Sequence, residues 1–168
     1  PLARAWRAHA GGDAAALGEG VPVDFVFPFR REMVPVLAWA SAESDHWGWS
    51  YLHALVLAAR DRVDEAGPLL RSLGDEPDYA PFFTTRALLA GAHAQDRERD
   101  LRRAIELDPT ERLLRIPLVQ QLQREGRWET ALEVSGGALD AFPEDFDLAL
   151  LHARSLNEVG GYAESLQI

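Results

Sequence analysis

The stretch that decides the fold runs from Leu118 to Pro143 and reads LVQQLQREGRWETALEVSGGALDAFP. When the C-terminal half of the chain is shifted so that Pro109 falls on Pro143, a turn glycine, the aromatic residue after it and small residues also fall on residues of the same kind. The other superposed pairs are Leu122 with Leu156, Gly126 with Gly160, Trp128 with Tyr162, and Ala104 with Ala138. Self-similarity at one fixed offset indicates a repeat architecture, in which each unit buries its apolar face against the next.

The offset and the order of residues in this unit resemble the tetratricopeptide repeat family. The residues that carry the resemblance are Leu118-Val119, Leu122, Gly126-Arg127-Trp128, Ala131, Ala138 and Pro143. A turn glycine tolerates the left-handed conformation that ends a helix, and small alanines let neighbouring helices approach closely. The resemblance covers residues 32–168 and implies an all-α, right-handed superhelical solenoid of antiparallel helix pairs. Its last unit is truncated, so we expect the chain to be part of a longer protein.

The repeat frame predicts the positions of the helices. We expect helices over residues 32–42, 46–60, 63–73, 79–92, 96–107, 112–125, 128–141 and 146–159, and from residue 162 onward. The sequence separation between Ala54 and its counterpart Val119 is slightly smaller than the length of two full repeats. The second unit is therefore three residues short. We place the loss in the turn from Gly91 to Asp96. Pro68 and Pro117 fall inside expected helices, which must therefore start late or kink.

Residues 1–31 differ in kind from the repeats. The alanine-rich stretch from Leu2 to Leu17 predicts one or two short helices. Phe25, Phe27 and Phe29 then alternate with other residues, which places three phenyl rings on one face of an extended segment. We expect this segment to strap across the first helical unit with its rings buried. A ligand-facing aromatic ladder is the alternative.

Composition excludes several classes of function. Arginine supplies all 17 basic charges, and the chain has neither lysine nor cysteine. Schiff-base chemistry, the lysine-bearing phosphate loop, thiol nucleophiles and cysteine-ligated zinc are therefore excluded. The net charge of −10 repels a nucleic-acid backbone. With no apolar run near the roughly 18 residues that span a bilayer and no visible targeting signal, we expect a cytoplasmic protein without cofactor, nucleic-acid or membrane partner.

Side chains with catalytic or metal-binding potential form no convincing site. His46 and His53 share a helical face at i, i+7, as a metal site would require, but no HExxH spacing occurs and an incidental pair is favoured. His152, Ser155 and Glu158 lie on one expected helix, whereas a nucleophile normally sits on a strained turn or a pocket wall. We therefore expect no enzyme activity.

Two further clusters have a structural interpretation and a functional one. Trp47, Trp49 and Tyr51 lie at the start of an expected helix, where core packing is favoured over a stacking platform for sugar. The charges from Arg97 to Glu106 alternate in sign, which is typical of a solvated helix with weak i, i+4 pairs and not of a phosphate site.

The tetratricopeptide resemblance implies that fixed positions of each first helix face a concave groove. The candidate groove residues are Tyr51, Leu55, Arg86, Gln120, Gln123, Arg124, Arg154 and Asn157. Arginines and side-chain amides can hold an extended acidic segment by bidentate and backbone hydrogen bonds. This set departs from the family's carboxylate clamp, which depends on paired basic residues and asparagines across three units. A solvated face is the alternative for each single residue.

A second, shorter resemblance concerns the N-terminal region. Residues Phe25–Arg30 and Val34–Ala40 are similar to a junction in large bacterial proteins, in which a β-rich, sugar-mutarotase-like domain of unknown function precedes tetratricopeptide repeats. Two functions therefore stay open. The first is a non-catalytic scaffold that binds a protein or peptide, including another domain of the same parent chain. The alternative is a helical accessory region of a larger carbohydrate-active enzyme.

Overall fold

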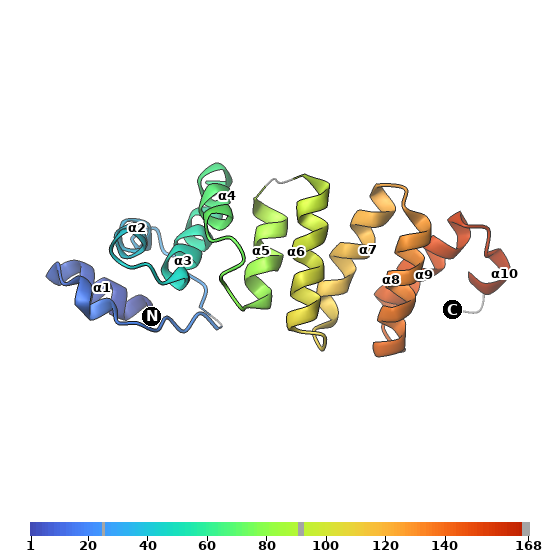
Figure 1. Ribbon diagram of the computed structural model, residues 1–168, viewed down its shortest axis with the longest axis horizontal. Helices are drawn as coiled ribbons and strands as arrows, with labels where there is room; N and C mark the ends of the chain where they lie inside the picture. Colours follow the sequence, from blue (N-terminus) through green and yellow to red (C-terminus); the bar gives the residue numbers. More distant parts are fainter. Residues whose placement is uncertain (25, 91–92, 166–168) are drawn as a thin grey trace. The chain divides into compact units, whose positions relative to one another are not determined.

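The computed structural model describes residues 1–24, 26–90 and 93–165. As the repeat pattern predicts, the fold is all-α, with helices packed as consecutive antiparallel pairs (Figure 1). The chain forms two compact units, Pro1–Gly91 and Ala92–Ile168, called unit 1 and unit 2 below. The N-terminal segment that precedes the repeats therefore belongs to the same compact body as their first helices.

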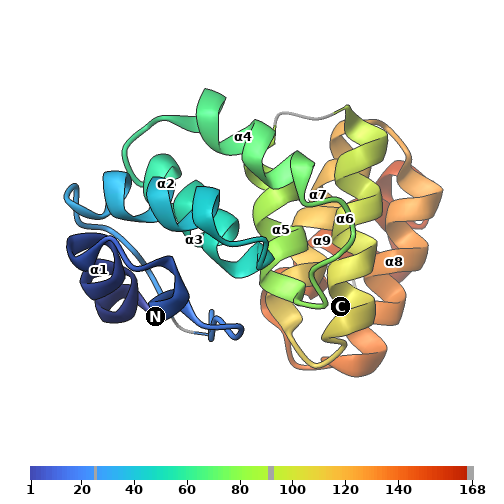
Figure 2. The same cartoon turned by 60° about the vertical axis from the view of Figure 1, so that its left-hand side comes forward.

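Unit 1 is built from helices that pack in chain order. Its elements are α1 (Leu2–Gly11), the 3-10 turn η1 (Ala14–Leu17), α2 (Met33–Glu43), α3 (Trp47–Ala58), α4 (Val63–Ser72) and α5 (Ala80–Leu89). Helix α1 packs against α2, α2 against α3, α3 against α4, and α4 against α5 (Figures 1 and 2). The largest fully buried side chains of this core are Leu17, Leu37, Trp49, Leu52, Leu57, Leu70, Phe82 and Phe83.

Unit 2 follows the same plan. Its elements are α6 (Ala94–Leu107), the 3-10 turn η2 (Arg112–Leu114), α7 (Arg115–Arg124), α8 (Trp128–Ala141), α9 (Phe146–Glu158) and α10 (Tyr162–Ser165). The expected turn glycines Gly126 and Gly160 have φ of 72° and 91°, so both end their helices in the left-handed region. Asp145 caps the N-terminus of α9, because its carboxylate accepts a hydrogen bond from the Leu148 amide at 3.1 Å.

The two prolines that fall inside expected helices are accommodated differently. Helix α7 starts late, at Arg115, so Pro117 lies in its first turn, where an amide has no intrahelical partner. Pro68 stays inside α4, next to the buried Gly67. A Cβ at Gly67 would lie 3.3 Å from the Cα of Ala90, so glycine allows α4 to pass close to the end of α5.

The structure corrects the expected burial of the aromatic strap. Phe27 and Phe29 are 73% and 66% exposed, and Phe25 lies outside the described residues. The segment is instead anchored by Val21 and Val23, which are each 7% exposed. The buried face of this stretch is therefore set by the valines that precede the phenylalanines.

The position of Trp128 after the turn glycine predicts that this aromatic side chain is nearly fully buried. The prediction was wrong, because Trp128 is half-buried. The starts of α5 and α6 lie two positions closer in the sequence than the starts of α3 and α4, or those of α9 and α10. Most of the three-residue shortening that we expected in the second unit thus falls between the starts of α5 and α6. Gly91 and Ala92, in the turn where we placed the loss, lie outside the described residues.

Candidate interaction surface

Exposed side chains of α7 and α9 form one face of unit 2, which we call the α7/α9 face. It consists of Leu113 in η2, Gln120 and Arg124 on α7, and Phe146, Leu150, Arg154 and Asn157 on α9. Within each helix these residues recur at spacings of three, four or seven, which keeps them on one side. Since α7 and α9 are in contact and separated in sequence by the single helix α8, they run in the same direction. The apolar residues Leu113, Phe146 and Leu150 therefore lie toward the end of the face at which α7 and α9 start, and the polar residues lie toward the C-terminal ends of these helices.

Gln123 joins the two helices beneath this face and does not line it. Its Nε2 donates to the carbonyl oxygen of Leu151 at 2.8 Å and to Ser155 Oγ at 2.9 Å. With Gln123 only 4% exposed and Ser155 fully buried, both side chains are packing groups. The expectation that Gln123 faces an open groove is therefore corrected, because the contact between α7 and α9 uses this position.

The two arginines of the face present their charge to solvent. The Arg124 Nε donates to the carbonyl oxygen of Gln120 at 3.2 Å, within its own helix. The Arg154 guanidinium lies 5.7 Å from the centroid of the Trp128 ring, close enough for a cation–π contact. Within the described parts of the chain, neither arginine forms an ion pair with a carboxylate. Their positive charges are therefore available to an anionic group.

The candidate groove residues of unit 1 have structural roles. Arg86 is 4% exposed, binds the Gly74 carbonyl oxygen, and pairs with Asp75 at 2.9 Å. Its guanidinium also lies 5.0 and 5.1 Å from the ring centroids of Phe82 and Phe83. Because these contacts fix a buried cation inside the helix pair, Arg86 does not line an open groove.

Tyr51 is likewise part of an aromatic cluster. Its hydroxyl lies 3.4 Å from Thr85 Oγ1, and burial raises the pKa of the phenol. The rings of Trp47 and Tyr79 are 6.2 and 5.9 Å from that of Tyr51, centroid to centroid. Burial raises the pKa of Tyr79 to about 12, with nearby Tyr51 and Asp24 adding to the shift. Of the other residues expected near this site, Trp49 is fully buried and Leu55 is half-buried.

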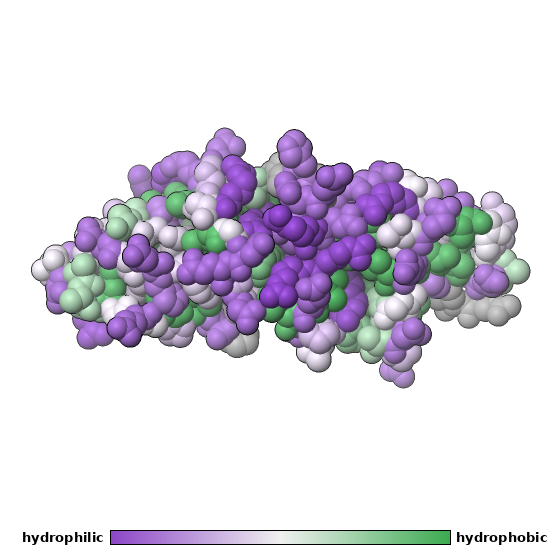
Figure 3. All heavy atoms as spheres, viewed as in Figure 1, coloured by the Kyte–Doolittle hydropathy of each residue, from purple (hydrophilic) through white to green (hydrophobic). Residues whose placement is uncertain are grey.

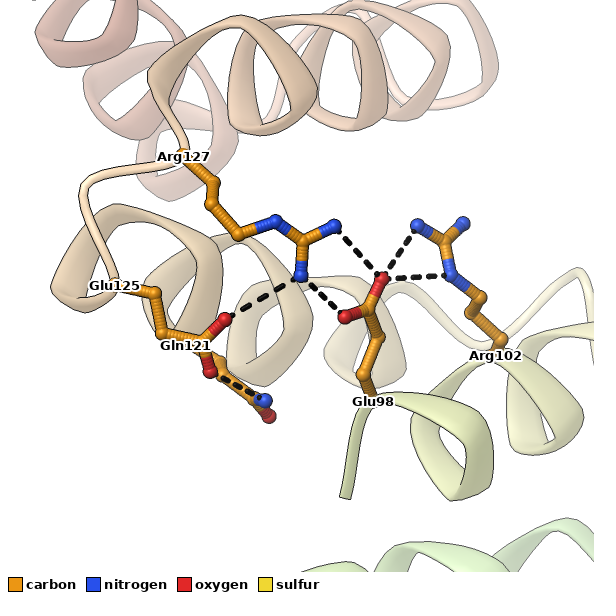
Figure 4. A network of polar contacts seen from close by, with 5 residues as sticks. All are labelled: Glu98, Arg102, Gln121, Glu125 and Arg127. Atoms are coloured by element: carbon orange, nitrogen blue, oxygen red, sulfur yellow. Dashed lines mark hydrogen bonds and ion pairs between the residues drawn. The ribbon is translucent and has the colours of Figure 1, made fainter. Parts of the chain in front are cut away.

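A charged network in unit 2 joins α6 to the end of α7 and the turn before α8 (Figure 4). Glu98 on α6 accepts from Arg127 at 2.5 Å and from Arg102 at 2.9 Å. Glu125 accepts from Arg127 at 3.3 Å and from Gln121 Nε2 at 2.8 Å. The Arg127 guanidinium, helped by Arg102, lowers the pKa of Glu98. The network connects α6 with the turn between α7 and α8, and the surface over α6 is hydrophilic, as its alternating charges predict (Figure 3).

His46 and His152 each contact a neighbouring polar group. His46 caps α3, since its Nδ1 accepts from the Gly48 amide at 3.0 Å, and burial lowers the pKa of His53. His152 lies 2.8 Å from Ser135 Oγ, whereas Ser155 Oγ contacts Gln123 and the Leu151 carbonyl oxygen, and burial lowers the pKa of His152. Ser135 is fully buried and lies on a regular helix, so it cannot reach a substrate.

The described residues contain no group of three or more histidine or acidic side chains arranged to hold a metal ion. Within the same residues, no helix is both long enough and apolar enough to cross a membrane.

Comparison with known proteins shows the fold. No protein-family profile and no curated protein matches the chain. Among solved structures, MamA AMB-1 is similar with a TM-score of 0.71 and 20% identity, covering 99% of this chain and 84% of that one. MamA MSR-1 has a TM-score of 0.65 and 19% identity, over 98% and 88% of the two chains. A tetratricopeptide repeat protein from Parabacteroides merdae has a TM-score of 0.69 and 13% identity, over 99% of this chain and 61% of that one.

These similarities establish a tetratricopeptide-like helical repeat fold, which is typical of protein-interaction scaffolds and generally non-catalytic. The expected parent protein with a mutarotase-like domain receives no support from them.

Proposed function

We propose that this chain is a non-catalytic interaction scaffold whose α7/α9 face binds an extended acidic segment of a partner protein. The observation that carries the proposal is the pair of exposed arginines, Arg124 and Arg154, which lie on neighbouring helices of one face without a carboxylate partner among the described residues. In a chain of net charge −10, this face offers positive charge.

The chemistry of the neighbouring residues fits such a ligand. Gln120 and Asn157 are exposed beside the arginines, and their amides can donate to and accept from the backbone of an extended segment. Guanidinium groups bind carboxylates through two parallel hydrogen bonds, which adds orientation to the attraction. Because Trp128 lies under Arg154, that guanidinium has less freedom to lose when a ligand binds.

The apolar end of the face adds a second requirement. Phe146 and Leu150 are 77% and 60% exposed, and they lie two turns and one turn before Arg154 on α9. A ligand that crosses both helices therefore meets apolar side chains along one edge and arginines along the other. We accordingly propose a segment in which acidic and apolar residues alternate.

No described feature favours the alternative role as an accessory to a carbohydrate-active enzyme, since the aromatic side chains expected to stack on sugar are largely packed into unit 1.

The test is binding of labelled peptides by fluorescence anisotropy. The probe is a short peptide of alternating aspartate and leucine, and the protein is compared with the double variant Arg124→Glu, Arg154→Glu. We expect the variant to bind at least about tenfold more weakly, because each lost charge-assisted contact becomes a repulsion. Binding to the unaltered chain should also weaken as salt is raised.

The matched control is the double variant Arg99→Glu, Arg103→Glu, which makes the same charge change on exposed positions of α6. It should retain the affinity of the unaltered chain. Equal losses in the two double variants would show that the peptide senses only net charge and would refute binding at the α7/α9 face.

A further inference from the structure

An aromatic pocket on unit 1 is independent of the α7/α9 face. It has a volume of about 370 Å³ and lies between α1 and the chain that leads into α2. Its lining residues are Leu2, Ala3, Trp6, Phe27, Phe29, Arg30, Glu32 and Met33. This volume lies within the range of ligand sites, whose walls are mostly apolar with a few polar groups.

The fold of unit 1 does not account for the exposure of these aromatic rings. Trp6, Phe27 and Phe29 are 47%, 73% and 66% exposed, although the segment that carries the phenylalanines is already anchored by buried valines. Contiguous exposed apolar residues on a soluble protein typically mark an interaction site. A ligand confined to the pocket would leave much of Phe27 in water, so a longer occupant fits the exposed surface better.

Two arginines hold the backbone of pocket-lining residues, and neither forms an ion pair with a carboxylate among the described residues. Arg60 donates to the Phe29 carbonyl oxygen, and the Arg7 Nε donates to the carbonyl oxygen of Ala3 at 3.4 Å. Both acceptors belong to pocket-lining residues. Neither arginine lines the pocket itself, and because backbone carbonyls carry no net charge, these contacts do not neutralise the two guanidinium groups.

The charge of the rim specifies the partner. Arg30 lines the pocket and Arg31 follows it, both exposed and with no ion pair to a carboxylate among the described residues. Helix α1 has the sequence LARAWRAHAG and contains no acidic residue. The lining itself holds one arginine, Arg30, and one carboxylate, Glu32, so the excess of positive charge comes from Arg31, which follows Arg30. A rim that is positive on balance around exposed aromatic rings complements an acidic segment with an apolar side chain.

We propose that the aromatic pocket is a second docking site, for a short acidic peptide segment that inserts one large apolar side chain between Trp6 and Phe29. Carboxylates on either side of this anchor bind Arg30 and Arg31, and the backbone of the segment covers Phe27. Buried apolar anchors surrounded by polar contacts are the usual arrangement of a protein interaction site.

The experiment measures fluorescence anisotropy with the full chain and labelled heptapeptides. Each peptide has two aspartates on either side of a central residue and a glycine at each end. We expect the peptide with central leucine to bind at least about tenfold more tightly than the one with central alanine, because the anchor fills the pocket. Replacing the four aspartates with asparagines should cause a loss of similar size.

Two kinds of variant locate the site. In the Arg124→Glu, Arg154→Glu background, which removes the α7/α9 face as a competing site, the double variant Trp6→Ser, Phe29→Ser should lose the preference for leucine. Leu88→Ser, which removes another exposed apolar side chain of unit 1, should retain it in the same background. The double variant Arg30→Glu, Arg31→Glu changes only exposed charges and should reverse the preference, so that a peptide with lysines in place of aspartates binds better.

Several outcomes would overturn the proposal. Absence of measurable binding at millimolar peptide, or equal binding of the leucine and alanine peptides, would exclude an anchored acidic segment. If the asparagine peptide binds as well as the acidic one, the pocket takes a neutral apolar ligand instead. If Trp6→Ser, Phe29→Ser converts a concentration-dependent dimer to a monomer and leaves peptide binding unchanged, a second copy of the chain covers the pocket. Loss of binding in Arg124→Glu, Arg154→Glu with normal binding in the pocket variants would assign the peptide to the α7/α9 face.

Discussion

Gly48 is the position at which the N-terminal segment meets the repeat helices. It lies in the first turn of α3 and is buried. A Cβ built on it would lie 2.8 Å from Val21 Cβ, 3.0 Å from Val21 Cγ1 and 3.1 Å from His46 Nδ1. The nearest obstacle is the first atom of a side chain, which cannot turn away without moving the backbone. We therefore expect Gly48→Ala to push the segment around Val21 off the surface of α3.

The sign of the effect follows from two opposing magnitudes. Replacing a helical glycine by alanine ordinarily stabilises by about 0.5–1 kcal/mol. Forcing an extra methyl group into a packed contact costs about 1–3 kcal/mol. We expect a net loss of about 1–2 kcal/mol in the free energy of unfolding of unit 1. Gly137→Ala is the matched control, because this glycine lies inside α8 with no atom within 4 Å of an added Cβ, and it should stabilise unit 2 by about 0.5–1 kcal/mol.

The assay is urea denaturation followed by tryptophan fluorescence and by circular dichroism. Four of the five tryptophans belong to unit 1, so a Trp128→Phe background restricts the fluorescence to that unit. Circular dichroism follows the helices of both units and shows whether they unfold together, as a two-state analysis requires. In this background, Gly48→Ala should shift the fluorescence transition to lower urea without changing its slope.

A double-mutant cycle identifies the partner of the new methyl group. Val21→Gly alone should destabilise unit 1, because a buried side chain is removed. When it is combined with Gly48→Ala, the two losses should fall short of additive by about 1 kcal/mol or more, since the clash no longer exists. The reasoning would be refuted if Gly48→Ala stabilised unit 1 as Gly137→Ala stabilises unit 2, or if the two changes were additive.

Three further predictions concern single residues. The lowered pKa of Glu98 means that its ionised form stabilises unit 2, so the unfolding free energy should fall as pH drops below the usual value of 4.5 and through the folded-state pKa, and Glu98→Gln should flatten this part of a pH titration. Gly126→Ala should cost unit 2 about 1 kcal/mol in chemical denaturation because φ is 72° there, and a neutral result would mean that the turn relaxes. The phenolate absorbance of Tyr79, identified as the titration step that is lost in Tyr79→Phe, should have its midpoint near pH 12. The stability that the folded protein gains from the neutral phenol should disappear between pH 10 and 12. A midpoint near pH 10 would contradict the burial of Tyr79.

The candidate sites were only partly predictable, because a repeat frame assigns a residue to a face but does not decide what packs on that face. Gln120, Arg124, Arg154 and Asn157 were expected from the frame and are exposed on α7 and α9. Gln123 comes from the same frame, yet the approach of α9 encloses it and directs its amide to Leu151 and Ser155. The apolar end of the face could have been found from the sequence, since Phe146 precedes Arg154 at a spacing that places both on one side of a helix. The groove positions implied by the repeat frame do not include Phe146.

The sequence by itself determined where helices begin and end. Turn glycines such as Gly126, the proline at Pro117 and capping residues such as Asp145 act through bonds within a few residues, so their effects can be read locally. Only the tertiary structure decided which part of the N-terminal segment is buried. Val21, Val23, Phe27 and Phe29 are all apolar and all occupy odd-numbered positions, so alternation assigns them to one side and does not distinguish them. Val21 is buried because the absent side chain of Gly48 leaves space for it on α3, a contact between residues far apart in the chain, whereas Phe27 and Phe29 further along the segment are exposed.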